Sequence, residues 1–416
     1  MHKRITESLT VVHLFLLPLG SLRAQEHDGH HHDGHQHSHP QAHGELLTIE
    51  HVLAMKQNKG TASAASDAAV TIGSSGSGAM TFEVLVTAKN LPKKVMEVNP
   101  FDGKRKRTIL SCAHGGFGHD YRQGRGEAYW FLQGAGIMRI EKDRSKIELV
   151  KTDPRMLKLN MHNATFFVHG EKAMIAWPAE GGRSVFITGL DGKLLHTIGI
   201  PTMDPYSKRP RYAPTDTAYL DGLLWITDGY ASKYVMSYDL DKSDWTGTIF
   251  GGPARKAEPG RFGTNHGITI HKGLIYVAGR RFARIHSFKP DTEFAGMFPM
   301  PDGSKPCDFE FFALDGKLYG VAASLDASAD NRKKGDKGAA VFIVDMSTLK
   351  IVSTIKPKDE LGLVKFTHLH NVFPTVDAEG VTLFCQSWNP GDFAILRQTK
   401  PIKNVKPGKV RVPTPE

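Results

Sequence analysis

A repeating pattern of short apolar strands and glycine-containing turns constrains the fold of this chain more than any other feature of its sequence. Each unit has an opening motif, an apolar strand, a turn with glycine, a second apolar strand and two further strands. The clearest units are residues 214–250 and 265–298, and similar units occupy residues 114–152, 162–200, 315–355 and 370–398. Six units of four short strands predict an all-β fold, a six-bladed β-propeller over residues 81–400.

Two other architectures fit the pattern less well. A two-sheet sandwich has about seven to nine strands, fewer than the units provide, and the periodic helices of an α/β barrel are absent from the sequence pattern. Residues 81–95 alternate apolar and polar side chains, which predicts an additional outer strand that helps to close the ring. We expect residues 401–416 to form a C-terminal tail.

The first 24 residues have the layout of a cleavable secretory signal peptide. A basic start is followed by an apolar run at residues 11–19 and by a small residue, Ala24, at the end. The apolar run is too short to span a bilayer comfortably, and an uncleaved anchor is the alternative. No later stretch of the sequence is apolar enough for a span, so we expect an exported protein, periplasmic or extracellular, without a membrane span.

Residues 25–80 are expected to form a histidine-rich disordered tail and a linker. Eight histidines lie between residues 25 and 44 among Asp, Gly and Gln, a composition that cannot build a core. These imidazoles would bind Zn²⁺, Cu²⁺ or Ni²⁺ loosely, because nothing in the tract fixes their geometry. A hydrophilic spacer without a metal role is the alternative. The Gly-, Ser- and Ala-rich residues 60–79 indicate a flexible linker.

Charge and cysteine content bear on two further classes of protein. The formal net charge is +10, and the densest basic run, residues 104–107, has no interleaved aromatic residues, so we expect a solvated loop and no nucleic-acid partner. Three cysteines, Cys112, Cys307 and Cys385, are too few for a disulfide framework, although one bridge remains open. These features predict no particular oligomeric state.

Histidines recur at the start of the innermost strand of several units, and in a propeller these strands line the central channel. The positions in register are His114, His162, Thr215, His266, Cys307 and His370. A single histidine there is usually a hydrogen-bonded structural residue, but four in register favour a metal site. We expect His162, His266 and His370 to hold a divalent metal ion. Further candidate ligands are His114, His119 and His368, with Cys307 less favoured.

Five short motifs lie in the third and fourth units: Ala213-Pro214-Thr215-Asp216, Ile226-Thr227-Asp228-Gly229-Tyr230, Pro259-Gly260-Arg261-Phe262, Asn265-His266-Gly267-Ile268 and Val277-Ala278-Gly279-Arg280. They resemble motifs of the peptidyl-hydroxyglycine α-amidating lyases, which belong with the NHL-repeat propellers. The resemblance covers residues 213–288 well and residues 110–395 thinly. It implies an NHL-type propeller, and it says more of the fold than of the activity, because NHL-type blades occur in many binding proteins.

The resemblance also implies roles for individual residues. Members of that lyase family hold zinc with three histidines from different blades, and the matching positions are His162, His266 and His370. They use a tyrosine in an Asp-Gly-Tyr motif, which is matched by Tyr230, and arginines near the substrate, one of which is matched by Arg280.

Two positions depart from the family pattern. A second arginine aligns with Gln133, which has no charge to stabilise a developing alkoxide or to attract a carboxylate. The family's calcium-binding aspartate aligns with Asn371, which keeps an oxygen ligand but loses a charge, so calcium is doubtful as a cofactor here. A methionine of the family aligns with His368.

Two functions follow from these observations. The first is an exported metal-dependent lyase or hydrolase, in which Tyr230 is the general acid or base and Arg280 orients an anionic group of the substrate. The second is a non-catalytic NHL-type binding module for a peptide, glycan or protein partner. The motifs favour the enzyme, whereas Gln133 and Asn371 favour the binding module. Either function places a small-molecule or peptide ligand in the central channel.

Overall fold

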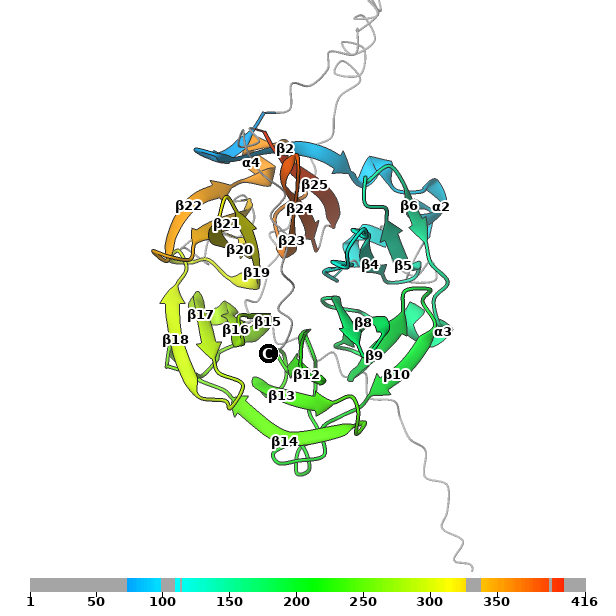
Figure 1. Cartoon of the computed structure of the whole chain (residues 1–416), viewed down its shortest axis with the longest axis vertical. Coiled ribbons are helices and arrows are strands. Elements are labelled where there is room, and N and C mark those ends of the chain that lie inside the picture. The colour runs from blue at the N-terminus through cyan, green and yellow to red at the C-terminus, as the bar shows by residue number, and fades with distance from the viewer. Residues whose placement is uncertain (1–72, 99–108, 113, 327–337, 389–390, 400–416) are drawn as a thin grey trace, which may run out of the picture. The chain divides into compact units, whose positions relative to one another are not determined.

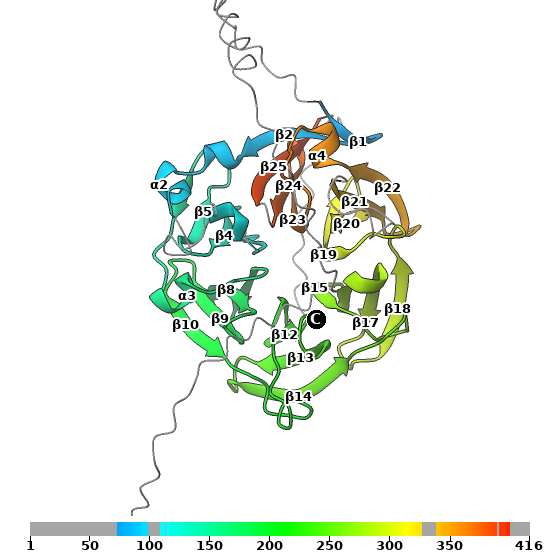
Figure 2. The ribbon, with the colours of Figure 1, turned by 180° about the vertical axis from the view of Figure 1, so that it is seen from behind.

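Six β-sheets arranged like blades around a ring make up the part of the chain that this computed structural model describes, namely residues 73–98, 109–112, 114–326, 338–388 and 391–399 (Figure 1). Five sheets have four strands and one has five, and neighbouring strands pair antiparallel. The fourth strand of a blade lies at the outside of the ring, as Figure 2 shows from behind for β10, β14, β18 and β22. The prediction of an all-β, six-bladed propeller is confirmed.

The first five blades follow the chain in order. Blade 1 contains β3 (Phe117–His119), β4 (Ala128–Leu132), β5 (Gly136–Ile140) and β6 (Ile147–Leu149). Blade 2 contains β7 (Thr165–His169), β8 (Lys172–Ala179), β9 (Ser184–Gly189) and β10 (Leu194–Ile198). Blade 3 contains β11 (Asp216–Leu220), β12 (Leu223–Thr227), β13 (Tyr234–Asp239) and β14 (Asp244–Gly251). Blade 4 contains β15 (Asn265–His271), β16 (Leu274–Gly279), β17 (Arg284–Phe288) and β18 (Phe294–Pro299). Blade 5 contains β19 (Pro306–Leu314), β20 (Lys317–Asp326), β21 (Ala339–Asp345) and β22 (Lys350–Ile355).

Blade 6 joins strands from the two ends of the described chain. Its spatial order is β1 (Ser75–Ser77), β2 (Met80–Thr87), β25 (Asp392–Gln398), β24 (Gly380–Ser387) and β23 (Leu369–Asp377). The pairing of β2 with β25 confirms a closing strand, but the strand ends at Thr87, and η1 and α2 occupy most of the remaining residues that the alternation of residues 81–95 assigns to it. Strand β1 begins six residues before the expected domain start at residue 81, within the expected linker. Its Gly and Ser residues carry no apolar pattern, and backbone pairing to β2 and a bond from Ser75 Oγ to Glu360 at 2.6 Å hold it.

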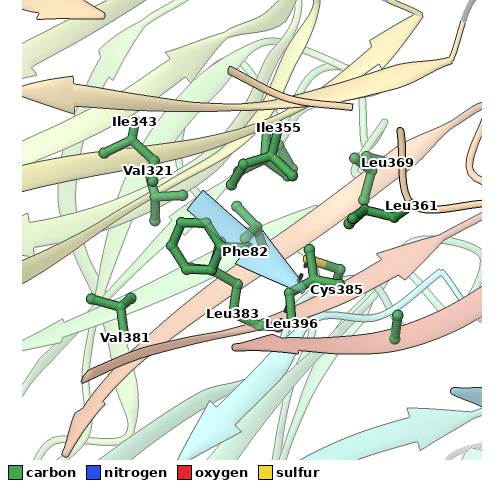
Figure 3. Packing of buried hydrophobic residues seen from close by; sticks show 14 of the residues in the cluster. Phe82, Val321, Ile343, Ile355, Leu361, Leu369, Val381, Leu383, Cys385 and Leu396 are labelled. Carbon is green, nitrogen blue, oxygen red and sulfur yellow. Dashed lines mark hydrogen bonds between the residues drawn. The ribbon is translucent and has the colours of Figure 1, made fainter. Parts of the chain in front are cut away.

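The hydrophobic core of the closing blade explains how the ring is held together. Phe82 of β2 is fully buried in one cluster with Val321 and Ile343 of blade 5 and with Leu383 and Leu396 of blade 6, and Figure 3 shows these side chains gathered around it. Full burial of such a side chain stabilises a fold by about 1.5–3 kcal/mol. A strand from the start of the described chain is thereby tied to strands near its end.

Two-residue turns join the first and second strands in blades 3, 4 and 5. The turn pairs are Asp221–Gly222, Lys272–Gly273 and Asp315–Gly316, and both residues of each pair have positive φ angles. Positive φ at both positions defines the type I′ turn, whose twist matches that of the flanking strands. This is why a glycine recurs at the same place in these three repeats.

Helical segments in the described residues are short. They are η1 (Ala88–Asn90), α2 (Lys93–Met96), η2 (Ile109–Cys112), α3 (Pro154–Leu157), η3 (Arg280–Phe282) and α4 (Pro357–Glu360). None of the helices in these residues is long and apolar enough to cross a membrane. The predicted signal peptide, histidine-rich tail, basic run and C-terminal tail lie outside the described residues.

Candidate metal centre

Five of the six positions in register carry imidazoles or a thiol, and the structure buries all five. His162, His266 and Cys307 are fully buried, His370 is 1 % exposed and His114 is 6 % exposed. His114 and His162 lie just before β3 and β7, whereas His266, Cys307 and His370 are each the second residue of an inner strand, in β15, β19 and β23. Successive blades therefore deliver them to the same level of the ring.

A β-bulge sets the direction of three of these side chains. Between Asn265 and Ile268, strand β15 has one residue more than its partner strand, and the same irregularity lies between Pro306 and Asp308 and between Leu369 and Asn371. A bulge bends its strand and re-aims the extra side chain, and such bulges occur often beside functional sites. The side chains of His266, Cys307 and His370 belong to these bulges in blades 4, 5 and 6.

The structure brings the three predicted zinc histidines together. Ring centroids of His162 and His266 are 5.4 Å apart, those of His162 and His370 are 5.4 Å apart, and those of His266 and His370 are 4.5 Å apart. Three imidazoles that bind one ion tetrahedrally at about 2.1 Å have ring centres about 5 Å apart. The three rings therefore lie side by side, but no set of described ligand atoms within 4.8 Å of one another contains all three of these histidines.

The hydrogen bonds of these histidines leave nitrogen lone pairs for a ligand. Among the described residues, neither ring nitrogen of His162 or of His370 has a hydrogen-bond partner, although His162 Nε2 lies 3.5 Å from Glu180 Oε2. Nδ1 of His266 lies 2.8 Å from the carbonyl oxygen of Cys307, and donation to this acceptor leaves Nε2 with its lone pair. Buried polar atoms are normally bonded, so unpartnered nitrogens at one place fit a metal ion.

Two overlapping sets of side chains bring their ligand atoms within 4.8 Å of one another: His114 with His162 and His370, and His266 with Cys307 and His370. Each set comes from three consecutive blades, and His370 belongs to both. His114 is a further candidate in the sequence analysis, and its ring centroid lies 4.1 Å from those of His162 and His370. These residues could hold a metal ion.

Tyr230 and Arg280 border the same centre. The phenolic oxygen of Tyr230 lies 3.0 Å from Nε2 of His266 and accepts a hydrogen bond from Arg280 Nη1 at 3.0 Å. The Arg280 guanidinium also lies 5.1 Å from the centre of the Tyr230 ring, a cation–π arrangement. Both side chains are half-buried whereas the histidines are buried, so the pair is more accessible to solvent than the imidazoles are, and we call its side of the centre the open side.

The Asp-Gly-Tyr motif builds the turn that carries Tyr230. Asp228 is buried and accepts hydrogen bonds from the backbone N–H groups of Ala213 and Ser232 at 2.8 and 2.7 Å. A Cβ at Gly229 would lie 2.2 Å from the carbonyl oxygen of Asn265, so only glycine fits between this turn and blade 4. The motif thus fixes Tyr230 beside His266.

Burial controls the protonation of the centre. It holds the pKa of His114, His266 and His370 well below the usual value, and for His266 the charge of Arg280 adds to the effect. Burial also raises the pKa of Tyr230 to about 12, against the opposing effect of Arg280. At neutral pH these imidazoles are neutral, which is the form that binds metals, and the phenol is protonated.

A second polar layer lies one residue further along the inner strands. The residues that follow His162, Thr215, Cys307 and His370 are the buried Asn163, Asp216, Asp308 and Asn371. The Asn371 amide donates to Asp308 and, at 3.2 Å, to Asn163 Oδ1. The carboxylates at this level, Asp216 and Asp308, thus come from blades 3 and 5. The resemblance instead implies a carboxylate in blade 6, at the position of Asn371.

The remaining predicted residues have separate surroundings. Gln133 Nε2 donates to the carbonyl oxygen of Lys158 at 3.0 Å, so its amide links blade 1 to the segment before blade 2. The His119 ring lies 5.7 Å from Phe373, whereas the His368 ring stacks 5.5 Å from His370. Of the two, His368 is the one beside the centre.

Three half-buried residues at the centre are absent from the sequence interpretation. Trp388 stacks on the His114 ring with centroids 4.5 Å apart, and Asn160 Nδ2 lies 2.7 Å from His114 Nδ1 and 3.3 Å from Glu180 Oε2. Asn160, Glu180 and Trp388 lie outside the strand starts that define the register. The available signal is that Asn160 precedes a ring histidine by two residues.

No protein-family model matches the sequence, and no curated protein matches it. Among solved structures, the chain is similar to a gluconolactonase from Xanthomonas campestris, with 16% identity, a TM-score of 0.45, and 69% of this chain and 89% of that chain covered. It is similar to a catalytically inactive virginiamycin B lyase from Staphylococcus aureus, with 14% identity, a TM-score of 0.41, and coverage of 66% and 78%. A luciferin-regenerating enzyme shows 10% identity, a TM-score of 0.45, and coverage of 69% and 91%.

Proposed function

We propose that this protein is a metal-dependent lyase or hydrolase whose reaction takes place at the axial histidines. The observation that carries the proposal is the set of buried, unpartnered nitrogens of His162 and His370, with the Tyr230–Arg280 pair on the solvent side. A purely structural set of histidines would have its nitrogens hydrogen-bonded. A divalent metal of the zinc type suits neutral imidazoles from several blades, whereas calcium prefers oxygen ligands.

The resemblance to α-amidating lyases suggests the reaction. When bound, the ion would polarise a hydroxyl or carbonyl oxygen of the substrate. Cleavage of an acylated hydroxyglycine breaks the carbon–nitrogen bond, takes the proton from the hydroxyl group and returns one proton to the amide nitrogen. The protein therefore has to move a single proton between two substrate atoms.

Tyr230 and Arg280 have the positions for proton transfer and for substrate orientation. Because the pKa of Tyr230 is about 12, its phenol is protonated at neutral pH and acts first as a hydrogen-bond donor and acid. Arg280 holds the phenolic oxygen and carries a fixed positive charge at the open side, where it would attract a carboxylate group.

One observation favours the binding module as a second candidate. The position at which the resemblance implies an anion-binding arginine holds Gln133, and its amide is committed to the Lys158 carbonyl. A site with one arginine in place of two would stabilise less negative charge in a transition state. In this second function the histidines hold a structural metal, and a peptide, glycan or protein binds at the open side.

Export and the partner class complete the proposal. The layout of residues 1–24 suggests an exported protein, periplasmic or extracellular, and the half-buried rim of Tyr230, Arg280 and Trp388 would accept a small molecule or peptide. The basic composition alone does not require a nucleic-acid partner.

The test compares metal content and cleavage in the wild type and in His370→Ala. His370 belongs to both ligand sets, and both proteins keep the histidine-rich tail, so loosely bound ions cancel in the difference. After a wash with a weak chelator, elemental analysis should show one ion per chain fewer in the variant, and glyoxylate release from an acylated hydroxyglycine should cease. Equal metal content in the two proteins would contradict the metal centre. Loss of metal without any cleavage by the wild type would favour the binding module.

A further inference from the structure

We propose that Cys307 is a thiolate ligand of the axial metal ion, together with His266 and His370. The inference rests on the proposed metal centre and changes its ligand set, because the thiolate takes the place of His162. It also narrows the choice of metal ion, since a site with thiolate and imidazole ligands selects thiophilic ions of the zinc class over calcium or magnesium.

The geometry of the ligand atoms is the first argument. Sγ of Cys307 and one ring nitrogen each of His266 and His370 lie within 4.8 Å of one another, and all three residues are buried. His370 has no hydrogen-bond partner on either nitrogen within the described chain, and His266 Nδ1 is already committed to the backbone of Cys307. The unpartnered nitrogens of His370 and the Cys307 thiol therefore lie close together, and His266 can add Nε2, which faces the Tyr230 hydroxyl at 3.0 Å.

The backbone supplies a second, independent argument. His266, Cys307 and His370 are the residues at the bulges of three consecutive inner strands, so the same local irregularity aims each of them. Blades 1 and 2 place His114 and His162 differently, before their inner strands begin. His266, Cys307 and His370 therefore share one backbone geometry, the bulge. A set that combined them with His114 or His162 would mix two backbone geometries.

Charge balance is the third argument. Arg280 Nη1 lies 3.9 Å from Cys307 Sγ, so a divalent ion in this place would be close to a fixed positive charge. Such a concentration of buried positive charge is costly unless an anion lies beside it. The carboxylates near the centre are Glu180, 3.5 Å from His162 Nε2 in blade 2, and the buried Asp308, which follows Cys307 and accepts a hydrogen bond from Asn371. A thiolate at Cys307 would lie next to Arg280 and would compensate positive charge on that side of the centre.

The other described cysteine shows what a cysteine without a ligand role looks like in this fold. Cys385 is fully buried in the hydrophobic cluster of blade 6, and Figure 3 shows it beside Leu383 and Leu396. Cys307 is equally buried, but its sulfur approaches a guanidinium group and two imidazoles. Buried cysteines often serve only as small apolar side chains, so Cys385 provides a matched control.

Cobalt(II) provides a readout other than activity. The intact chain is freed of metal by a chelator and titrated with Co²⁺, and absorption is recorded in the near ultraviolet, where thiolate-to-cobalt charge transfer appears. Residues 25–44 contain no cysteine, so ions on the histidine-rich tail do not produce this band. We expect the band in the wild type to saturate at one Co²⁺ per chain, to vanish in Cys307→Ser, and to persist in Cys385→Ser and Cys112→Ser.

Each outcome has a definite meaning. A wild type that binds one Co²⁺ beyond the ions of the tail but shows no band overturns the thiolate ligand and leaves the proposed function standing. A wild type that binds no such ion overturns both. A band that survives in Cys307→Ser, or that disappears in Cys112→Ser or Cys385→Ser instead, also refutes the assignment. If Cys307→Ser fails to fold, a wild-type band that persists in both Cys112→Ser and Cys385→Ser still assigns the thiolate to Cys307, and a wild-type protein without the band still refutes it.

Discussion

The hydroxyl group of Tyr230 and Nε2 of His266 lie 3.0 Å apart and form the middle link of a directional hydrogen-bond chain. Arg280 donates to the phenolic oxygen, the phenol donates to His266 Nε2, and His266 Nδ1 donates to the Cys307 carbonyl. An ion that bound His266 Nε2 would take the lone pair that accepts the phenolic proton. The Tyr230 hydroxyl would then have to turn towards another acceptor, and a substrate oxygen or nitrogen is the natural one.

Replacement of Tyr230 by Phe should separate proton transfer from metal binding. The variant keeps the ring but loses the hydroxyl group that joins Arg280 to His266, so we expect kcat to fall by about 10²–10⁴-fold with metal content unchanged. Tyr219→Phe is the control, since its hydroxyl bonds Gly222 N at the turn of blade 3. Full activity in Tyr230→Phe would remove this residue from the mechanism.

Two substitutions of Arg280 test whether its charge or its shape matters. Arg280→Met removes the charge and the bond to Tyr230, so KM for a carboxylate substrate should rise by about tenfold or more, as for loss of a charged hydrogen bond. Arg280→Lys keeps the charge and should recover part of the loss in KM. Steady-state kinetics on acidic and on esterified substrates make the comparison. If the ester suffers the same loss as the acid, Arg280 does not bind the carboxylate.

Closure of the ring by β2 predicts a large difference between two neighbouring substitutions. Phe82→Ala removes a fully buried ring from the seam between blades 5 and 6, so the free energy of unfolding should fall by about 3–5 kcal/mol. Leu85 lies on the same strand but is 37% exposed, and Leu85→Ala should change stability by less than about 1 kcal/mol. Urea unfolding of both variants measures the difference, and similar losses would show that β2 is not a core strand.

A buried histidine outside the centre gives a pH-dependent prediction. Burial, with a smaller effect of Arg284, lowers the pKa of His286 to about 4, whereas an unfolded chain has the usual value of 6.5. Between pH 6.5 and pH 4 the unfolded chain is protonated at His286 whereas the folded chain is not. The free energy of unfolding therefore decreases as the pH falls towards 4. In His286→Leu this loss is absent. The stability difference between variant and wild type should shift by about 3 kcal/mol in favour of the variant from pH 7 to pH 4.

Unfolding curves at several pH values test this prediction, and the same difference at pH 7 and pH 4 would show that His286 is not held neutral by the fold.

Some features of the molecule follow from the sequence and others do not, for physical reasons. The Asp-Gly and Lys-Gly turns repeat because type I′ turns need positive φ, and the repeat reveals the blades. Register then places His162, His266 and His370 at one level. Register does not reveal a bulge, because an extra residue in a strand changes the pairing and leaves the composition as it was. Only the three-dimensional structure therefore shows that Cys307 lies within reach of two histidines, and that Trp388 and Glu180 contact the histidines of the centre.

The pairing of β2 with β25 has a consequence for the order in which the molecule is completed. Because synthesis runs from the N-terminus, the ring cannot close before strand β25 has been made, and His370 lies in the blade that closes it. An ion shared by His370 and a histidine of another blade would act as a cross-link across that seam. The metal-loaded ring should consequently open more slowly than the metal-free ring, so the ion would determine the lifetime of the native state as well as its chemistry.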